Sequence, residues 1–193
     1  MKTLPPVSKP TKSLTVGAPA PAFELVDVAG SVLRSAELLR KGHLLLTFYR
    51  GAWCSCCKAD LAEVSRATAA LTSRNVTVLA VFHELSREAS SRIQAEYSLP
   101  FPLVDDPNAR AAEAFGIGRS TQEMAAIEAE FGPELIVLKL GQPWIQPMQA
   151  RYLIGRDGII AHSDVLIDYR ERSDVAKLLP MLDVLQSKAL HQN

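Results

Sequence analysis

Residues 44–58 read LLLTFYRGAWCSCCK, and this stretch holds all three cysteines of the chain. The run LLLTFY is short, apolar and followed by an Arg-Gly pair, which is typical of a buried strand. Beyond the cysteines, residues recur at spacings of three and four, which predicts one face of an amphipathic helix. The residues of that face are Leu61, Val64, Thr68 and Leu71. The cysteines are therefore expected at a turn between a strand and a helix.

Cys54 and Cys57 have the spacing of a redox pair. The free backbone amides at a helix N-terminus lower the pKa of a thiol held there. Residues three apart in a first helical turn lie on nearly the same face, with Cβ atoms about 5–6 Å apart, so a small movement permits a disulfide. Cys56 points away from both. We therefore favour a working Cys-x-x-Cys motif over small buried core residues.

A zinc site is disfavoured, because the sequence has no second ligand pair and its four histidines are scattered. We expect no metal or other cofactor.

The composition predicts one globular domain. The chain has 193 residues, of which 48% are hydrophobic, enough for a sizeable core. Lys plus Arg equals Asp plus Glu, at 21 each, which argues against nucleic acid and anionic membranes as partners. There is no apolar signal region and no run of about eighteen apolar residues. We expect a soluble, cytoplasmic protein, in which a Cys-x-x-Cys is a working dithiol.

The order of the predicted elements indicates an α/β fold with a central mixed sheet flanked by helices. A proline-rich arm (1–15) precedes a single domain (16–193). The first two long strands, 44–49 and 76–82, should run parallel, joined by a right-handed crossover. The other predicted elements are a hairpin over one end of the fold (22–33), strands at 101–107 and 135–138, a hairpin at 152–160, and helices at 35–39, 86–97, 108–115, 120–131 and 174–190, the last with a kink or restart at Pro180.

Five pieces of the chain resemble, in order and nearly in spacing, the alkyl hydroperoxide reductase C / thiol-specific antioxidant (peroxiredoxin-like) family. They read VGAPAPAFEL, LLLTFYRGAWCSCCKADL, VTVLAVF, LPFPLVDDPNARAAEAFGIG and YLIGRDGII. The branch with a Trp-Cys-x-x-Cys site is the most similar, and it closes with a segment like residues 168–172. The resemblance covers roughly residues 16–186. It implies a thioredoxin-like fold, a hydroperoxide substrate, reduction by thioredoxin or glutathione, and pairing into a homodimer without an intersubunit disulfide.

The resemblance leaves two orders of attack open. Counting from Tyr49 as in ordinary peroxiredoxins places Cys57 at the peroxidatic position. Counting as in thioredoxin makes Cys54, after Trp53, the attacking thiol and Cys57 its buried partner. Our working hypothesis is that Cys57 becomes a sulfenic acid, with which Cys54 condenses to form a disulfide.

A peroxidatic thiolate needs a nearby cation. Gln149 stands where the resemblance implies arginine or, in this branch and in thioredoxins, proline. Arg151 lies two residues later, on the same face if a strand already runs there. Arg50, just after the central strand, is the other candidate.

The remaining candidate residues line the substrate pocket. Tyr49 and Gln149 belong to it by position, and Trp53 is expected as an apolar wall. Two interpretations of His83 stay open, an exposed loop residue and a proton donor to the leaving hydroxide. Cys56 and Trp144 are expected to pack in the core.

Three functions follow from this reading. The first is a thiol peroxidase. The second is a thioredoxin-like disulfide reductase, which the Trp-Cys-x-x-Cys favours and the missing proline disfavours. The third is a non-enzymatic redox sensor or binding scaffold.

Overall fold

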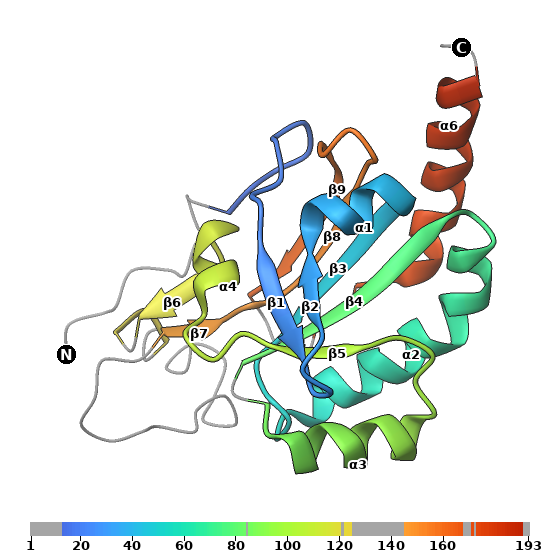
Figure 1. Cartoon of the computed structure of the whole chain (residues 1–193). Helices are drawn as coiled ribbons and strands as arrows, with labels where there is room; N and C mark the ends of the chain where they lie inside the picture. Colours follow the sequence, from blue (N-terminus) through green and yellow to red (C-terminus); the bar gives the residue numbers. More distant parts are fainter. Residues whose placement is uncertain are drawn as a thin grey trace.

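The computed structural model describes residues 13–83, 85–120, 122–124, 145–167, 171 and 173–190. Its main sheet has seven strands in the order β2-β1-β5-β4-β3-β8-β9 (Figure 1). Their bounds are β1 Glu24–Asp27, β2 Val32–Arg34, β3 His43–Tyr49, β4 Val76–Phe82, β5 Leu103–Asp105, β8 Gln149–Ile154 and β9 Ile160–Leu166. A small second sheet pairs β6 Gly118–Ser120 with β7 Ile145–Pro147.

Strand β3 is an interior strand of the main sheet, between β4 and β8, and all of its residues are buried. It pairs in parallel with β4 and antiparallel with β8. The sheet is therefore mixed, and the two long strands predicted to run parallel do so. Strand β5 continues the parallel part beside β4, and β9 pairs antiparallel with β8.

Helices cover both faces of this sheet (Figure 1). Because side chains of a strand alternate between faces, Leu44, Leu46 and Phe48 belong to one core cluster, whereas Leu45 and Tyr49 belong to the other. Helices α1 (Ser35–Lys41) and α4 (Arg110–Ala114) contribute to the first cluster. Helices α2 (Ser55–Thr72), α3 (Arg87–Tyr97) and α6 (Leu178–Leu190) contribute to the second. The predicted layers are confirmed.

Helix α2 buries the face that its periodicity predicts. Leu61, Val64, Thr68 and Leu71 are all buried. This face packs against the side of the sheet that carries Leu45 and Tyr49, so the second cluster surrounds the cysteine end of the helix.

Several predicted boundaries differ from the structure. The hairpin β1–β2 does not lie over one end of the fold: β1 pairs with β5, so the hairpin extends the sheet edge. Strand β8 begins at Gln149, three residues before the predicted hairpin arm, because backbone pairing with β3 extends to Ala150 and pairing with β9 to Gln149. The small β6–β7 sheet was not predicted, since its strands are short and lie far apart in the sequence.

Two local signals in the sequence are confirmed by the structure. Ser120 and Glu123 form the expected capping box: the Ser120 backbone N–H donates to Glu123 Oε2 at 2.8 Å, and the Glu123 N–H donates to Ser120 Oγ at 3.3 Å. Pro180 lies in the first turn of α6, which follows a 3₁₀ turn at Val175–Lys177. The helix restarts there, because a first-turn proline loses no intrahelical hydrogen bond.

Other predictions fall outside the described residues. These are the strand at 135–138, the part of the helix after residue 124, Trp144, most of the segment 168–172 and the first twelve residues of the arm. The last residues of the predicted arm do contact the fold. The Leu14 N–H donates to Phe115 O at 3.2 Å, and just after the arm the Gly17 N–H donates to Ile160 O at 2.9 Å.

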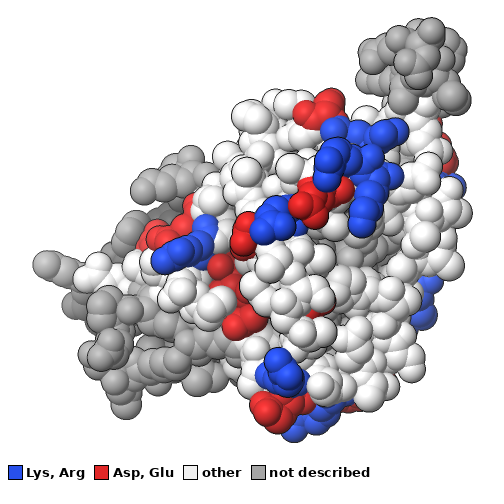
Figure 2. Space-filling model, viewed as in Figure 1, with Lys and Arg blue, Asp and Glu red and all other residues white. Residues whose placement is uncertain are grey.

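Charged side chains of both signs are interspersed on the face shown in Figure 2, in keeping with the balanced composition. At the surface of the β1–β2 hairpin, Arg34 forms ion pairs with Glu24 at 2.9 Å and with Glu37 at 3.5 Å. Within the described part of the chain, no helix has the length and apolar character needed to cross a membrane.

Candidate active site

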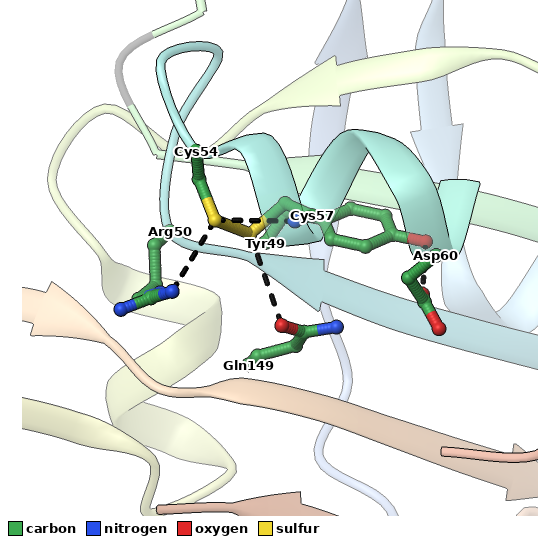
Figure 3. The surroundings of a disulfide bond; sticks show 6 residues. All are labelled: Tyr49, Arg50, Cys54, Cys57, Asp60 and Gln149. Carbon is green, nitrogen blue, oxygen red and sulfur yellow. Dashed lines mark hydrogen bonds between the residues drawn. A yellow bond between two sulfur atoms is a disulfide. The ribbon is translucent and has the colours of Figure 1, made fainter. Parts of the chain in front are cut away.

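The cysteines lie at the turn between β3 and α2, as predicted, and Cys54 and Cys57 form a disulfide (Figure 3). Their Cα atoms are 5.2 Å apart. The Cys54 N–H donates to Gly51 O at 3.1 Å, which closes the turn, and Cys54 then caps the helix. Cys56 is a free thiol that is partly buried against the second core cluster, in line with the packing role expected of it.

The sulfur of Cys54 receives two hydrogen bonds. The backbone N–H of Cys57 donates to Cys54 Sγ at 3.2 Å, and Arg50 Nη2 donates to the same sulfur at 3.3 Å (Figure 3). A helix N-terminal amide and a guanidinium both stabilise negative charge. In the reduced protein these two donors would therefore favour the thiolate form of Cys54.

The sulfur of Cys57 has different surroundings. Cys57 is completely buried, and its Sγ lies 3.9 Å from Gln149 Oε1 (Figure 3). An amide oxygen accepts a hydrogen bond from a thiol but gives none to a thiolate, and burial also disfavours the charged form. This environment is suited to a protonated Cys57 thiol.

Arg151 directs its charge to Asp60 of α2. Its Nη2 lies 2.7 Å from Asp60 Oδ2, its Nε donates to Thr47 Oγ1 at 3.1 Å, and its Nη1 donates to Ser173 O at 2.6 Å. Arg151 and Asp60 are 2% and 1% exposed, so this ion pair is fully buried. Gln149 and Arg151 share one face of β8, as predicted. The Arg151 guanidinium, however, pairs with Asp60 and so connects α2 to the sheet.

Tyr49 joins this pair from β3. Its hydroxyl donates to Asp60 Oδ2 at 2.8 Å (Figure 3). Burial, and after it the Asp60 carboxylate, raise the pKa of Tyr49 well above its ordinary value, so the hydroxyl stays a donor. Among the described residues, the second carboxylate oxygen, Asp60 Oδ1, has no hydrogen-bond partner. Tyr49 therefore connects β3 to α2 through Asp60, and it lies at the buried base of the site.

His83 and Trp53 differ in burial and in the residues that they contact. His83 is buried after β4, where its backbone N–H donates to Tyr49 O at 3.4 Å and its Nδ1 lies 3.2 Å from Asp106 O. Trp53 is 39% exposed, and the Arg50 guanidinium carbon lies 5.8 Å from the centre of its ring. The observed contact of Trp53 is thus with Arg50, whereas His83 is turned toward Asp106, directly after β5.

A cavity of about 550 Å³ lies elsewhere, between β1 and the start of α4. Leu25, Leu85, Asp106 and Arg110 are among its lining residues, and neither cysteine is. We place the candidate site at the cysteine turn, because reactive groups converge there. Within the described residues, no cluster of three His, Cys, Asp or Glu side chains is arranged to hold a metal ion.

Comparison with known proteins assigns the chain to a family. The model of the AhpC/TSA family matches residues 16–163, which is most of the sequence. The chain belongs to the AhpC/TSA family. Together with the Cys54–Cys57 disulfide, this membership indicates an oxidoreductase.

Individual relatives of this AhpC/TSA protein are distant. Thiol-disulfide oxidoreductase ResA of Bacillus subtilis is 28% identical over 106 residues, which cover 55% of this chain and 58% of ResA. The chain thus spans less than two thirds of the curated relatives that it matches.

Solved structures show the fold of the AhpC/TSA chain. Peroxidoxin BcpB from Mycobacterium tuberculosis superposes with a TM-score of 0.67 at 17% identity, covering 90% of this chain and 97% of BcpB. The mitochondrial 1-Cys peroxiredoxin of yeast superposes with a TM-score of 0.68 at 12% identity, covering 91% of this chain and 78% of that one. The predicted thioredoxin-like fold is confirmed.

Asp60 is the residue of this AhpC/TSA site that sequence reasoning missed. It follows Cys57 by three positions and precedes Leu61, so it lies on the buried stripe of α2. An acidic residue on a buried helix face requires a charged or hydrogen-bonding partner. That signal was available in the sequence, but it could not identify Arg151 as the partner.

Proposed function

We propose that this protein is a thiol peroxidase in which Cys54 takes the peroxide oxygen and Cys57 resolves the product. The contrast between the two sulfurs supports this assignment. Cys54 Sγ receives hydrogen bonds from the Cys57 N–H and from Arg50, whereas Cys57 Sγ is fully buried beside the neutral Gln149 amide. The geometry favours the thioredoxin-like order of attack over our working hypothesis that Cys57 attacks.

The proposed cycle has three steps. The Cys54 thiolate attacks the outer oxygen of a hydroperoxide, and the O–O bond breaks. The OH group passes to the sulfur, which becomes a sulfenic acid, and the alkoxide or hydroxide leaves and takes a proton from solvent. The Cys57 thiol then displaces water from this sulfenic acid and forms the disulfide. Two external thiols reduce the disulfide by exchange and are themselves oxidised.

Arg50 is the cation that this chemistry requires. Negative charge develops on the leaving oxygen as the O–O bond breaks, and a preorganised guanidinium next to the sulfur stabilises it. Cys54 is only 3% exposed, a degree of burial that suits a small hydroperoxide better than a bulky protein disulfide. The proposal includes thioredoxin or glutathione as reductant, a cytoplasmic location and a homodimer, the last of which light scattering would test.

A second candidate is a thiol–disulfide reductase acting on proteins. The exposed indole of Trp53 beside Cys54 favours it, because it offers an apolar contact to a peptide. The curated relatives named above are also thiol–disulfide oxidoreductases.

Two assays on the same preparation distinguish the candidates. Stopped-flow mixing of the reduced protein with hydrogen peroxide or an organic hydroperoxide should give rapid oxidation, and thioredoxin or glutathione should sustain turnover. Reduction of insulin disulfides should be slow by comparison. Rapid insulin reduction without peroxide consumption would establish the second candidate, and inactivity in both assays would leave a redox sensor or scaffold.

Replacing Arg50 with methionine should slow oxidation by peroxide at least about tenfold, because a cation this close to a sulfur shifts its pKa by about one unit or more. Methionine keeps much of the volume and removes the charge. The measurement is the second-order rate constant with hydrogen peroxide as a function of pH. An unchanged rate constant in Arg50→Met would remove the electrostatic role of Arg50.

A further inference from the structure

Trp53 is a large aromatic side chain that remains 39% exposed although it directly precedes the buried Cys54. Its ring is not free on the surface. The Arg50 guanidinium carbon lies 5.8 Å from the ring centre, within the range of a cation–π contact. The same guanidinium donates through Nη2 to Cys54 Sγ at 3.3 Å. Arg50 is therefore in contact with the indole and the sulfur at once.

Gly51 provides the surface on which the indole lies. A Cβ atom added to Gly51 would overlap the Nε1 and Cδ1 atoms of Trp53. Gly51 is not in the left-handed backbone region, so an alanine there suits the local backbone and acts through the indole. The segment 50–54 thus folds back on itself. Gly51 packs against the Trp53 indole, and the indole contacts Arg50.

We propose that Trp53 is a positioning residue, whose indole face holds the Arg50 guanidinium against Cys54 Sγ, with Gly51 as its seat. The assignment rests on the proposed peroxidase function and adds a determinant of its rate. An arginine side chain has many rotamers, and holding it at one sulfur costs conformational entropy. A second contact for the flat guanidinium reduces that cost, because arginine stacks on aromatic faces.

The test measures the reactivity of Cys54 alone. In a Cys56→Ser/Cys57→Ser background Cys54 is the single thiol, and the pH profile of its alkylation by iodoacetamide reports its pKa. Trp53→Leu keeps apolar bulk but removes the aromatic face. At pH values below the thiol pKa, Trp53→Leu should lower the fraction of Cys54 present as thiolate about two- to fivefold. This change corresponds to the free energy of a cation–π contact. Trp53→Phe should restore most of the thiolate, and Gly51→Ala should resemble Trp53→Leu.

Double variants separate positioning from a general structural effect. In an Arg50→Met background, Trp53→Leu should cause no further change of the thiol pKa, because the guanidinium it positions is absent. In a Trp53→Leu background, Gly51→Ala should likewise add nothing. An unchanged pKa in Trp53→Leu, or an equal change with and without Arg50, would overturn the assignment.

The pKa measurement distinguishes failure of the positioning role from failure of the proposed function. The pKa of Cys54 is measured without peroxide, so the expected pattern in a protein that does not consume peroxide would keep the positioning role and reject the peroxidase. Normal peroxide consumption, together with a Cys54 pKa that does not change in Trp53→Leu, would keep the peroxidase and reject the positioning role.

Discussion

Replacing Cys54 with serine is expected to reduce peroxide consumption to the rate seen without protein, whereas Cys57→Ser should still complete one oxidation. The reason is the different surroundings of the two sulfurs. Cys54 Sγ accepts hydrogen bonds from the Cys57 N–H and from the Arg50 guanidinium. Both donors stabilise a thiolate, which is the attacking species. A serine hydroxyl at either position is not oxidised by peroxide, so each variant removes one sulfur of the pair, and Cys56 is common to both.

The location of the sulfenic acid provides the decisive measurement. After one equivalent of hydrogen peroxide, dimedone labelling followed by mass spectrometry should find sulfenate on Cys54 in the Cys57→Ser protein. Cys56→Ser serves as the control and should retain both the burst of oxidation and the disulfide. Sulfenate on Cys57 in the Cys54→Ser protein, with none on Cys54 in Cys57→Ser, would reverse the roles and restore our working hypothesis.

The Asp60→Asn variant should lose about 3–5 kcal/mol of unfolding free energy, because the change leaves the Arg151 charge buried without its counter-ion. The Arg151 Nη2 to Asp60 Oδ2 distance is 2.7 Å, and both side chains are almost fully buried. Asparagine keeps the shape and can still accept from Tyr49. The loss therefore reports the missing charge, and urea unfolding followed by circular dichroism measures it.

The chain contains a matched control for this change. Arg74 and Asp183 form an ion pair with the same 2.7 Å distance, but they are 27% and 57% exposed. Asp183→Asn should destabilise the protein far less, since solvent screens an exposed pair. Combining Asp60→Asn with Arg151→Met should cost less than the sum of the single changes. Equal losses at the two sites would contradict the account of a buried, essential pair.

The elements of the sheet were predictable wherever a local pattern carried the information. Strand β4 has the bounds that its apolar, β-branched run predicts, and α2 buries its predicted face. The strands that were missed are the two of the small second sheet. Strands β6 and β7 each contribute three residues and pair across a long separation in sequence, so no local periodicity marks them. The hairpin β1–β2 was recognised, but its place at the edge beside β5 depends on a distant strand.

The sequence by itself determined the turn with Cys54 and Cys57 at the start of a helix, because spacing and periodicity act over a few neighbouring residues. The tertiary structure decided which cation lies beside which sulfur. Arg50 is four positions from Cys54 and contacts it, whereas Arg151 pairs with Asp60, 91 positions away. The physical reason is that a buried guanidinium lies where its charge is best compensated, and Asp60 becomes its partner only after α2 packs on the sheet.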